Sequence, residues 1–502
     1  MALADDEPVA DFGTFKTKVG TESVTSVKLT ADLTATDDIQ ISHTMTIKLN
    51  GHTINEGKKG FLVSGGTLTI VGPGSIVFKG KFEGVQLSGS ASLVLESGTV
   101  TISSTSNDYK WVDAIYNSGS GSVTVGGGKG TAKLYANGGL GVKGGCGIRN
   151  TGSGSVTVKS NADIMGEAVY RTAGDDGTRG YGIYSAKGAV SVEGGKVFGK
   201  ASLTGTHTAR GYGIYSEKGA VTVSGGTVKG EGTSGARGFG VYTESGSVTV
   251  KGTAELIGQG HNGIGHGICV KKNNVAVDIS GGVVKGFNEG ALGRAVGGDG
   301  GSVNLTVSDG YLGGNMTDLA SGRGLSGGYY TVEPPAEHIA TGYAAFECQK
   351  TYAGVKHTWT IKPLVKTTLT PKKSSPTSVK PGVDFQLKVT LKDKDGKPLS
   401  GRTVTCGDVT AVTDNNGVAT FSFPAMTEGE ERSYTFVFDG DTQHAGSQCV
   451  VDVKATSNPE PAPKPTPPPK TGDNTPILLL SALAVLSIAG LAIVGRKRRK
   501  ER

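Results

Sequence analysis

Two short phrases recur through the middle of the chain, one built on Gly-Ile-Tyr and one close to Gly-Ser-Val-Thr-Val. Equivalent residues in successive copies lie 25 to 35 residues apart. Repeats of this period indicate a fold in which similar units stack on one another, as in solenoids and propellers. The apolar pairs of the second phrase are Leu68/Ile70, Leu93/Leu95, Val123/Val125, Val156/Val158, Val190/Val192, Val221/Val223, Val248/Val250, Val275/Val277 and Val303/Leu305.

A third phrase, Gly-Gly-x-Val, often follows the valine pair, so each repeat contains three short strands. Alternating apolar residues separated by glycine turns describe one coil of a parallel β-helix, with the apolar residues stacked into interior ladders. Propeller blades have a longer period and pair antiparallel strands, so they fit less well. We expect about ten coils over residues 24–312, which at about 4.8 Å per coil make a rod about 50 Å long. The third phrase contributes Val197, Val228 and Val283.

Two segments carry a family resemblance. Residues 44–76 read TMTIKLNGHTINEGKKGFLVSGGTLTIVGPGSI, which resembles the opening coils of right-handed β-helix proteins found on bacterial surfaces. Residues 327–362, from Gly-Gly-Tyr-Tyr to Thr-Trp-Thr-Ile, are similar to the segment that often closes such regions. The resemblance implies a fold and a location and does not identify a ligand.

The sequence pattern changes at Lys366, where the repeats stop and longer strands with alternating apolar residues begin. The order of strands and turns resembles the bacterial immunoglobulin-like modules of surface adhesins, which implies a β-sandwich of about 90 residues. Cys406 and Cys449 lie in this region, and the sequence leaves open whether they form a disulfide. The expected strands are Asp384–Leu391, Arg402–Cys406, Val418–Phe423, Ser433–Phe438 and Gln448–Lys454.

An uncharged apolar run extends from Ile477 to Val494. Its 18 residues span about 27 Å as a helix, enough to cross the core of a bilayer. A cluster of Arg and Lys follows and should stay on the cytoplasmic side, so the rest of the chain lies outside the cell. This tail holds a net charge of +5, which leaves only +2 of the total +7 for the other residues. No basic face for nucleic acid is therefore expected.

The residues before this run are Pro468, Pro469, Lys470, Thr471 and Gly472. Together with the apolar run and the basic tail they resemble the LPxTG cell-wall sorting signal of Gram-positive surface proteins, with Pro468 where the family has Leu. The resemblance implies that a sortase transpeptidase cuts the Thr471–Gly472 bond and joins the threonine to peptidoglycan. The Pro-rich residues before the signal form an extended spacer.

The first residues carry no apolar signal region, although Ala2-Leu3-Ala4 has the small-x-small pattern that precedes signal-peptidase cleavage. We expect that the chain starts near the mature end of an exported protein.

The Gly-Ile-Tyr phrase predicts a ladder of tyrosines on the outside of the rod. Period-2 alternation places Ile183, Ile214 and Val241 inside, so their neighbours Tyr184, Tyr215 and Tyr242 should point outward. A flat row of exposed rings one coil apart suits stacking on sugar rings, and the alternative is that the rings cover the coil surface or pack against a loop. The same alternation assigns Tyr181, Tyr212 and Phe239 to the core.

Many β-helix proteins are polysaccharide lyases or hydrolases, which cluster acidic, basic or His side chains on one exposed face of neighbouring coils. Arg179, Arg210 and Arg237 recur just before the tyrosine phrase, which indicates a stacked turn position rather than a site of converging unlike groups. The other ionisable candidates are His261 and His266, which flank a Gly-rich turn, and Asp175 and Asp176, which lie near Arg179 as counter-charges. No metal-ligand spacing, phosphate-binding loop or cofactor motif occurs in a credible context. We predict no catalytic residues, no metal and no cofactor.

The sequence therefore predicts an all-β, cell-wall-anchored, adhesin-like surface protein whose rod presents a binding face to host or environmental glycans or proteins. Two alternatives stay open, a wall-tethered polysaccharide lyase or hydrolase and a structural stalk without a specific ligand. The oligomeric state cannot be read from the sequence. The expected parts are an N-terminal segment (1–23), a parallel β-helix (24–326), its cap (327–365), an immunoglobulin-like sandwich (366–455), a Pro-rich linker (456–467) and a sorting signal with a transmembrane helix at 477–494 (468–502).

Overall fold

The structure is a computed structural model. It describes residues 6–57, 60–80, 82–104, 111–139, 144–170, 177–203, 209–233, 236–261, 264–288 and 291–457. The chain divides into two compact units, Met1–Val365 and Lys366–Arg502, and each is described by itself. Both are built from β-strands, which confirms the predicted all-β class.

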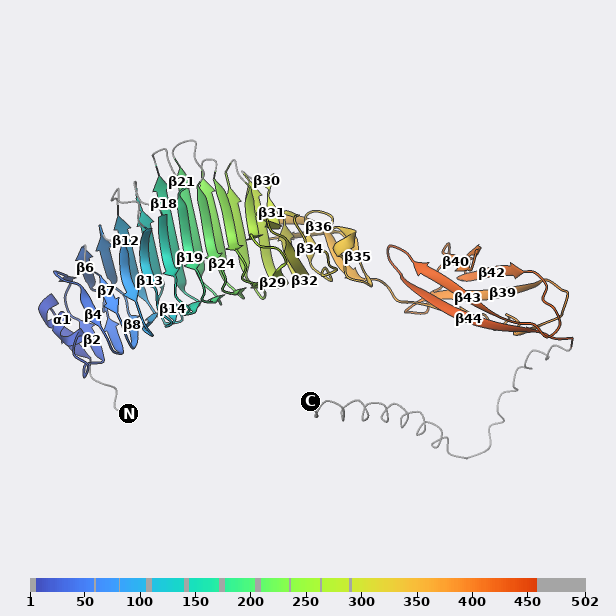
Figure 1. Cartoon of the computed structure of the whole chain (residues 1–502), viewed down its shortest axis with the longest axis horizontal. Helices are drawn as coiled ribbons and strands as arrows, with labels where there is room; N and C mark the ends of the chain where they lie inside the picture. The colour runs from blue at the N-terminus through green and yellow to red at the C-terminus, as the bar shows by residue number, and fades with distance from the viewer. Residues whose placement is uncertain are drawn as a thin grey trace, which may run out of the picture. The chain divides into compact units, whose positions relative to one another are not determined.

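The first unit is a parallel β-solenoid in which every coil contributes a strand to each of three ladders (Figure 1). The first ladder begins with β1 (Glu7–Val9), which pairs with β2 (Ser26–Leu29), and it includes the strands that carry the valine pairs. Its strands are β2 (Ser26–Leu29), β5 (Met45–Lys48), β8 (Thr67–Val71), β11 (Ser92–Leu95), β14 (Val123–Val125), β17 (Val156–Val158), β20 (Val190–Val192), β23 (Val221–Val223), β26 (Val248–Val250) and the first parts of β29 (Val275–Asn288) and β32 (Val303–Gly313).

The second ladder continues from the first after a tight corner, and β29 and β32 run through both. Its other strands are β3 (Leu33–Thr34), β6 (Thr53–Gly57), β9 (Ser75–Lys79), β12 (Gly98–Ser104), β15 (Ala132–Gly138), β18 (Ala162–Tyr170), β21 (Lys196–Leu203), β24 (Thr227–Thr233) and β27 (Glu255–Gly260), with β30 (Ala291–Leu292) paired antiparallel to β29.

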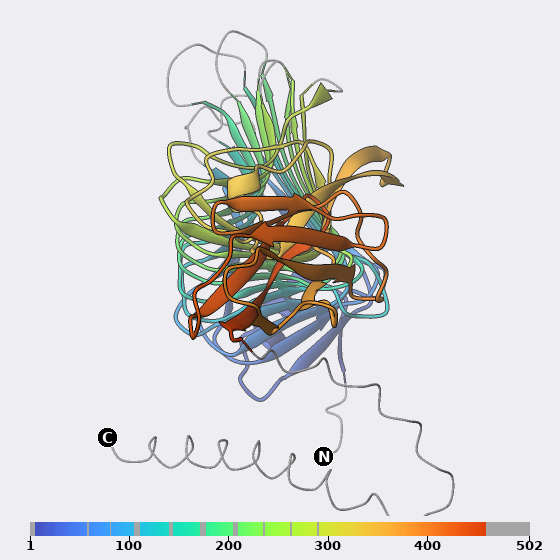
Figure 2. The ribbon, with the colours of Figure 1, turned by 90° about the vertical axis from the view of Figure 1, so that its right-hand side faces the viewer.

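The third ladder is an 11-stranded parallel sheet that carries the Gly-Ile-Tyr phrase. Its strands are β4 (Ile39–Ile41), β7 (Phe61–Val63), β10 (Glu83–Leu87), β13 (Trp111–Asn117), β16 (Gly144–Asn150), β19 (Arg179–Ser185), β22 (Arg210–Ser216), β25 (Arg237–Thr243), β28 (Gly265–Val270), β31 (Arg294–Gly298) and β33 (Asn315–Met316). Figure 2 looks along the long axis, where successive coils project onto one another.

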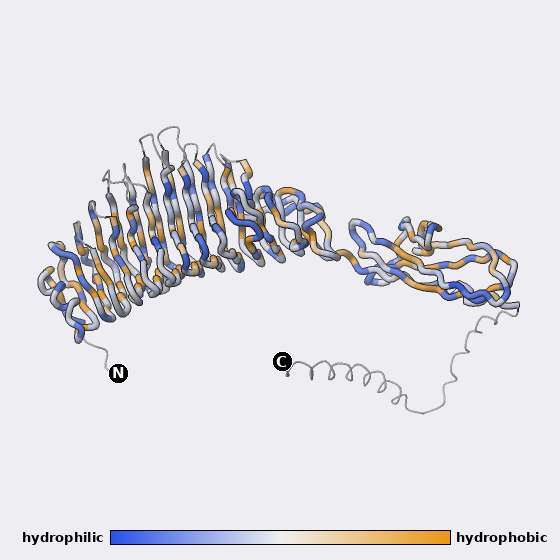
Figure 3. Tube along the Cα trace, viewed as in Figure 1, coloured by the Kyte–Doolittle hydropathy of each residue, from blue (hydrophilic) through white to orange (hydrophobic). Residues whose placement is uncertain are grey.

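The core is the stack of apolar residues that alternate inward along the three ladders. Val190, Val221 and Val248 are directly opposite one another on successive coils and are almost fully buried. Apolar positions therefore recur at the same place from coil to coil (Figure 3). The register differs from the predicted one at β29. There Val277 and Ile279, rather than Val275 and Val277, lie opposite the valine pair of β26.

A buried polar ladder closes the corner between the third ladder and the next coil. Asn117 donates to the carbonyl of Gly121 at 2.8 Å and to the side-chain oxygen of Asn150 at 3.0 Å. Asn150 repeats this pattern with the carbonyl of Gly154 and the hydroxyl of Ser185. Each side chain thus satisfies a turn carbonyl in its own coil, and the asparagines also reach the next coil.

Both ends of the solenoid are covered. At the start, α1 (Phe12–Val19) is capped by Asp11, whose carboxylate accepts from the backbone N–H of Thr14 at 2.9 Å. Phe15 and Val19 of this helix are buried in the solenoid core. At the other end, β34 (Tyr329–Tyr330) precedes η1 (Ala336–His338) and the antiparallel hairpin of β35 (Tyr343–Tyr352) and β36 (Val355–Pro363). Both elements cover strand edges and apolar surface that an open solenoid end would expose.

The second unit is a β-sandwich with its own core, centred on Leu387, Val404, Phe421 and Phe436. One sheet joins β37 (Thr367–Pro371), β39 (Phe385–Asp393) and β42 (Val418–Phe423). The other joins β38 (Ser378–Val379), β44 (Ala445–Ala455), β43 (Glu431–Gly440), β40 (Thr403–Cys406) and β41 (Val409–Val412).

The remaining expectations concern a disulfide in the sandwich, the transmembrane helix and the sorting signal. Cys406 and Cys449 are free thiols in the structure. Within the described residues no helix is long and apolar enough to cross a membrane. The run Ile477–Val494 and the signal residues Pro468, Pro469, Lys470, Thr471 and Gly472 lie outside the described residues.

The valine ladder gives the first testable prediction. Val221→Asp places a charge in a dry stack and should lower the free energy of unfolding by about 3 to 5 kcal/mol. The matched control is Thr222→Asp, because Thr222 is the next residue of β23 and points outward, half exposed. That change should cost within about 1 kcal/mol. Denaturant unfolding of the purified chain measures both, and equal stabilities would contradict the assigned orientation of β23.

Candidate functional site

The outer face of the third ladder carries three columns of side chains that repeat from coil to coil. Cα partners in neighbouring strands are in register along each column, which confirms the stacking of arginines expected from the sequence. The columns are Arg179–Arg210–Arg237, Tyr181–Tyr212–Phe239 and Tyr184–Tyr215–Tyr242.

The two aromatic columns share this face because the alternation of inward and outward residues breaks at a glycine. In β19 that residue is Gly182. A Cβ there would lie 2.6 Å from both the carbonyl oxygen of Gly213 and Cγ1 of Val197, so only glycine fits this close approach. The rings of Tyr181 and Tyr184 on either side of it meet edge to face, with centroids 5.6 Å apart.

The prediction that Tyr181, Tyr212 and Phe239 point into the solenoid core is therefore wrong, because their side chains lie on the outer face. All three are buried, but they belong to an aromatic cluster separate from the main apolar core. Tyr181 stacks on Tyr212 at 4.9 Å, and Tyr212 stacks on Phe239 at 5.0 Å. The neighbouring rings, rather than the coil interior, keep these side chains from water.

The tyrosine column points outward as predicted, but its rings do not present their faces. Tyr184 and Tyr215 stack with an interplanar angle of 10°, and Tyr215 and Tyr242 stack at 8°. The ring faces pack against one another in these stacks, and Tyr242 is only 3% exposed. The expected flat strip of exposed rings is therefore not present, and the column offers ring edges along its length.

The hydroxyl of each tyrosine in this column donates to a carboxylate. Tyr184 donates to Glu217, Tyr215 to Glu244 at 2.6 Å, and Tyr242 to Asp299 at 3.3 Å. Burial and the adjacent carboxylate raise the pKa of Tyr184 and of Tyr215 above the ordinary value, so both stay protonated as donors.

The columns are interrupted in β16, where a hollow of about 180 Å³ opens. Cys146 occupies the position that Tyr181 occupies in the next coil, and Gly144 occupies the position of Arg179. The ring of Trp111 lies across Gly144, where an added Cβ would meet it at 2.1 Å. The hollow is lined by Trp111, Cys146, Arg149, Thr151, Arg179, Tyr181, Tyr184, Tyr215 and Glu217.

A buried ion cluster borders the hollow. Arg149 donates from Nε to Asp113 at 2.6 Å and from its terminal nitrogen to Glu83 at 3.2 Å, and its guanidinium lies 4.2 Å from the ring centroid of Tyr116. Burial raises the pKa of Asp113 to about 7, although the guanidinium of Arg149 acts to lower it. Burial also raises the pKa of Cys146, so this thiol stays protonated. The cluster fixes Arg149 in the wall of the hollow.

The described ionisable residues among those considered for catalysis do not converge on one site. His266 lies in β28, where its ring stacks on Phe239 at 5.3 Å, so it is not the solvated loop residue expected. Burial lowers the pKa of His266 to about 4. Asp175 and Asp176 lie outside the described residues, and His261 precedes a short undescribed turn. In the part of the chain that the structure describes, no group of His, Cys, Asp and Glu could hold a metal ion.

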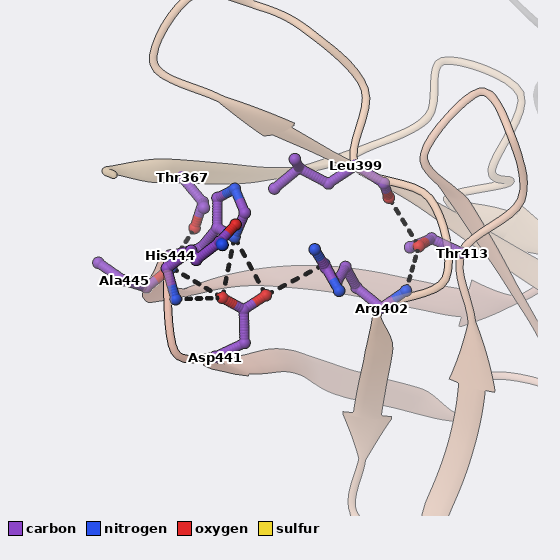
Figure 4. Close-up of polar contacts among 8 residues, drawn as sticks. Thr367, Leu399, Arg402, Thr413, Asp441, His444 and Ala445 are labelled. Carbon is purple, nitrogen blue, oxygen red and sulfur yellow. Dashed lines mark hydrogen bonds and ion pairs between the residues drawn. The ribbon is translucent and has the colours of Figure 1, made fainter. Parts of the chain in front are cut away.

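A second polar cluster lies in the second unit, at the turn between β43 and β44 (Figure 4). Asp441 accepts from Nδ1 of His444 at 2.9 Å and pairs with Nε of Arg402 at 3.0 Å. Thr413 accepts from the backbone N–H of Arg402 and donates to the carbonyl of Leu399. All of these bonds tie turns to strand ends, so the cluster braces the sandwich.

Comparison with known families identifies two short segments. Residues 373–457 match the family described as Macroglobulin domain MG4, which covers most of the sandwich that the sequence analysis expected to be immunoglobulin-like. Residues 469–502 match the LPXTG cell wall anchor motif. Comparison with curated proteins finds no match. The solenoid, which holds the hollow, is covered by neither family.

The anchor motif makes this chain a cell-wall-anchored surface protein, as the sequence predicted. The motif also implies processing by sortase and attachment to peptidoglycan. The matched segment begins one residue after Pro468 and includes Thr471 and Gly472.

The buried carboxylate predicts a pH dependence of stability. The folded chain binds the proton of Asp113 more tightly than the unfolded chain does, because the folded pKa is about 7 and the ordinary value is 3.8. Its contribution to the free energy of unfolding is therefore full at low pH and declines as the pH rises from about 4 to 7, by about 4 kcal/mol at most. In Asp113→Asn this decline should disappear. Denaturant unfolding at pH 5 and pH 8 tests it, and equal pH dependence in both proteins would refute the assignment.

The anchor predicts a change in cell fractionation. Thr471→Ala keeps the backbone carbonyl that the sortase attacks but removes the threonine side chain of the anchor motif, so the chain should no longer be recognised and covalently joined to peptidoglycan. Thr466→Ala is the matched control, since Thr466 lies in the same Pro-rich stretch outside the matched segment. Release of the chain by muralytic digestion reports the linkage. If Thr471→Ala remains bound to purified peptidoglycan, this bond is not the one processed.

Proposed function

We propose that this wall-anchored protein is an adhesin-like binding protein whose solenoid binds a glycan, with one sugar ring seated in the hollow above Cys146. The observation that carries the proposal is the interruption of the aromatic columns. A cysteine in register with Tyr181, and an arginine in register with Tyr184, leave the end of both ring stacks facing a cavity. At the other end of the columns Phe239 is covered by the ring of His266, and Tyr242, followed by Cys269, is only 3% exposed.

The size and chemistry of the hollow suit a single sugar ring. With a volume of about 180 Å³ the hollow has room for one small ring and not for a long stretch of polymer. Aromatic faces pack against the apolar C–H side of a sugar, while charged and hydroxyl groups around the rim bond its hydroxyls. Tyr184 and Trp111 supply the first kind of group, and Arg149, Thr151 and Glu217 supply the second. Tyr181, which is 2% exposed and meets the ring of Trp111 at 5.4 Å, supports these rings from below.

Binding without turnover is the favoured form of this function. A lyase or hydrolase needs an accessible base or acid at the substrate. The carboxyl of Asp113 has a raised pKa but is fully buried, and the thiol of Cys146 is held protonated. Among the described lining residues Glu217 is the one carboxylate, and it already accepts from Tyr184, whereas glycosidases use a pair of carboxylates. A stalk without a ligand, in turn, would gain packing by continuing the aromatic columns through β16.

The proposal is tested by glycan binding to intact cells that display the chain. Tyr184→Ala removes the ring at the end of the stack and should weaken binding of the best glycan on an array by about five-fold, or about 1 kcal/mol. Tyr135→Ala is the matched control, because Tyr135 is also half-buried and donates to an acid, Asp163, at 3.0 Å, but lies on the second ladder.

Melting temperatures of both variants separate lost binding from lost folding. Weaker binding by Tyr184→Ala alone, with the two melting temperatures lowered equally, supports the site. Equal effects of the two substitutions on binding, or no effect of either, would contradict it and would favour a structural stalk.

A further inference from the structure

The first column of the outer face, Arg179–Arg210–Arg237, carries a positive charge on each of three successive coils. Arg179 and Arg210 are in register on neighbouring coils, and both are half-buried. The third member, Arg237, has the carboxylate of Asp299 at 3.5 Å. Among the described residues no carboxylate lies within ion-pair distance of Arg179 or Arg210; Asp175 and Asp176, the counter-charges expected from the sequence, are not among those residues. The two guanidinium groups instead lie against the hydroxyls of Tyr181 and Tyr212, which are neutral.

The second ladder shows the alternative arrangement on the same solenoid. Glu167, Lys200 and Glu231 are in register on three successive coils, so charge alternates along the column. Lys200 and Glu167 form an ion pair at 2.8 Å. Stacked side chains of alternating sign stabilise one another, whereas stacked like charges repel. The arginine column therefore lacks the internal compensation that this fold provides elsewhere.

The position of Arg179 connects this charge to the hollow. Arg179 lines one edge of the hollow, at the start of β19, and Glu217 lines another, beyond Tyr184. Arg149 also lines it, but Asp113 and Glu83 already neutralise that guanidinium. Among the described residues, the hollow therefore has a cation without an ion-pair partner at one edge and a hydrogen-bond acceptor at another, with aromatic rings between them.

We propose that the ring bound in the hollow is that of an acidic sugar, whose single negative charge, a carboxylate or a sulfate ester, pairs with Arg179. This inference rests on the proposed glycan-binding function and specifies its ligand. The planar guanidinium presents parallel N–H donors that match two oxygens of such a group. The ring's hydroxyls then face Glu217, which accepts hydrogen bonds. A doubly charged phosphate fits less well, because Glu217 lies in the same wall.

The arginine column also indicates the direction in which a polymeric ligand would run. Arg210 repeats the Arg179 position one coil further on, so a second acidic unit of the same polymer can follow the column along the solenoid. Arg237 ends this run, because Asp299 compensates it. The ligand class that fits best is therefore a polymer with acidic groups on successive sugars, rather than a single terminal acidic sugar.

The test uses intact cells that display the full chain and four labelled probes. An oligogalacturonate is compared with the same oligomer after reduction of its carboxyl groups to alcohols, and dextran sulfate is compared with dextran. The wild type should bind an acidic probe at least about ten-fold more tightly than its neutral counterpart, and this preference should shrink as salt is raised. The pair that shows the preference identifies the carboxylate or the sulfate ester as the group bound.

Two substitutions assign the preference to the column. Arg179→Gln should lower the affinity for the acidic probe about ten-fold or more and lower the affinity for its neutral counterpart much less, so that the acidic preference shrinks. Arg179→Lys should restore part of the loss, because it keeps the charge but not the paired donors. Arg237→Gln is the matched control, in the same column but compensated by Asp299 and outside the hollow.

The outcomes separate this inference from the function on which it rests. Equal binding of acidic and neutral probes, with Tyr184→Ala still weakening both, would overturn the acidic ligand and keep the glycan site. An acidic preference that survives Arg179→Gln would overturn the assignment to this column. If none of the four probes binds and Tyr184→Ala has no effect on any glycan, both the ligand and the site are wrong.

Discussion

The parallel register between coils is the constraint on which the rest of the first unit depends. It places each residue beside its equivalent in the coil before and the coil after, so every side chain must be compatible with a copy of itself. Valine meets these terms in the core, where Val190, Val221 and Val248 stack in direct register. Asparagine meets them at a corner, where Asn117 and Asn150 bond each other. Tyrosine meets them on the outer face through offset ring stacking.

This constraint explains which parts of the fold could be predicted from the sequence. Side chains that stack with their own kind leave a periodic signal, so the valine ladders and the order of the coils were readable. The strands of the sandwich were readable from alternation, as in β42, whose bounds Val418–Phe423 match the expectation. The helix α1 was missed because its eight residues show only a short apolar spacing, Phe12, Phe15 and Val19, although Asp11 and Thr14 form a recognisable N-cap.

The site could be predicted only in part, because its geometry depends on departures from the repeat. The sequence identified the tyrosine column and the arginine column, but period-2 alternation placed Tyr181 inside, since it takes no account of the break at Gly182. It also gave no sign that the rings would stack on one another, which requires their orientation. The hollow arises from one atypical strand, β16, in which the phrase reads Gly-Gly-Cys-Gly-Ile-Arg-Asn. Scanning a repeat for its least typical copy is the signal that would have found it.

The order of residues along one column explains why the hollow lies at β16. From coil to coil the column reads Glu83, Asp113, Cys146, Tyr181, Tyr212, Phe239, His266 and Arg294. Uncharged rings fill its centre, and the acids Glu83 and Asp113 lie next to each other at one end, where their mutual repulsion calls for a cation. Cys146 stands at the junction between the acidic end and the aromatic stack. Arg149, three residues further along β16, reaches back across this junction to neutralise Asp113 and Glu83. The hollow therefore lies where the acidic end, neutralised by Arg149, meets the aromatic stack, and the ring of Trp111 borders it at 5.4 Å from Tyr181.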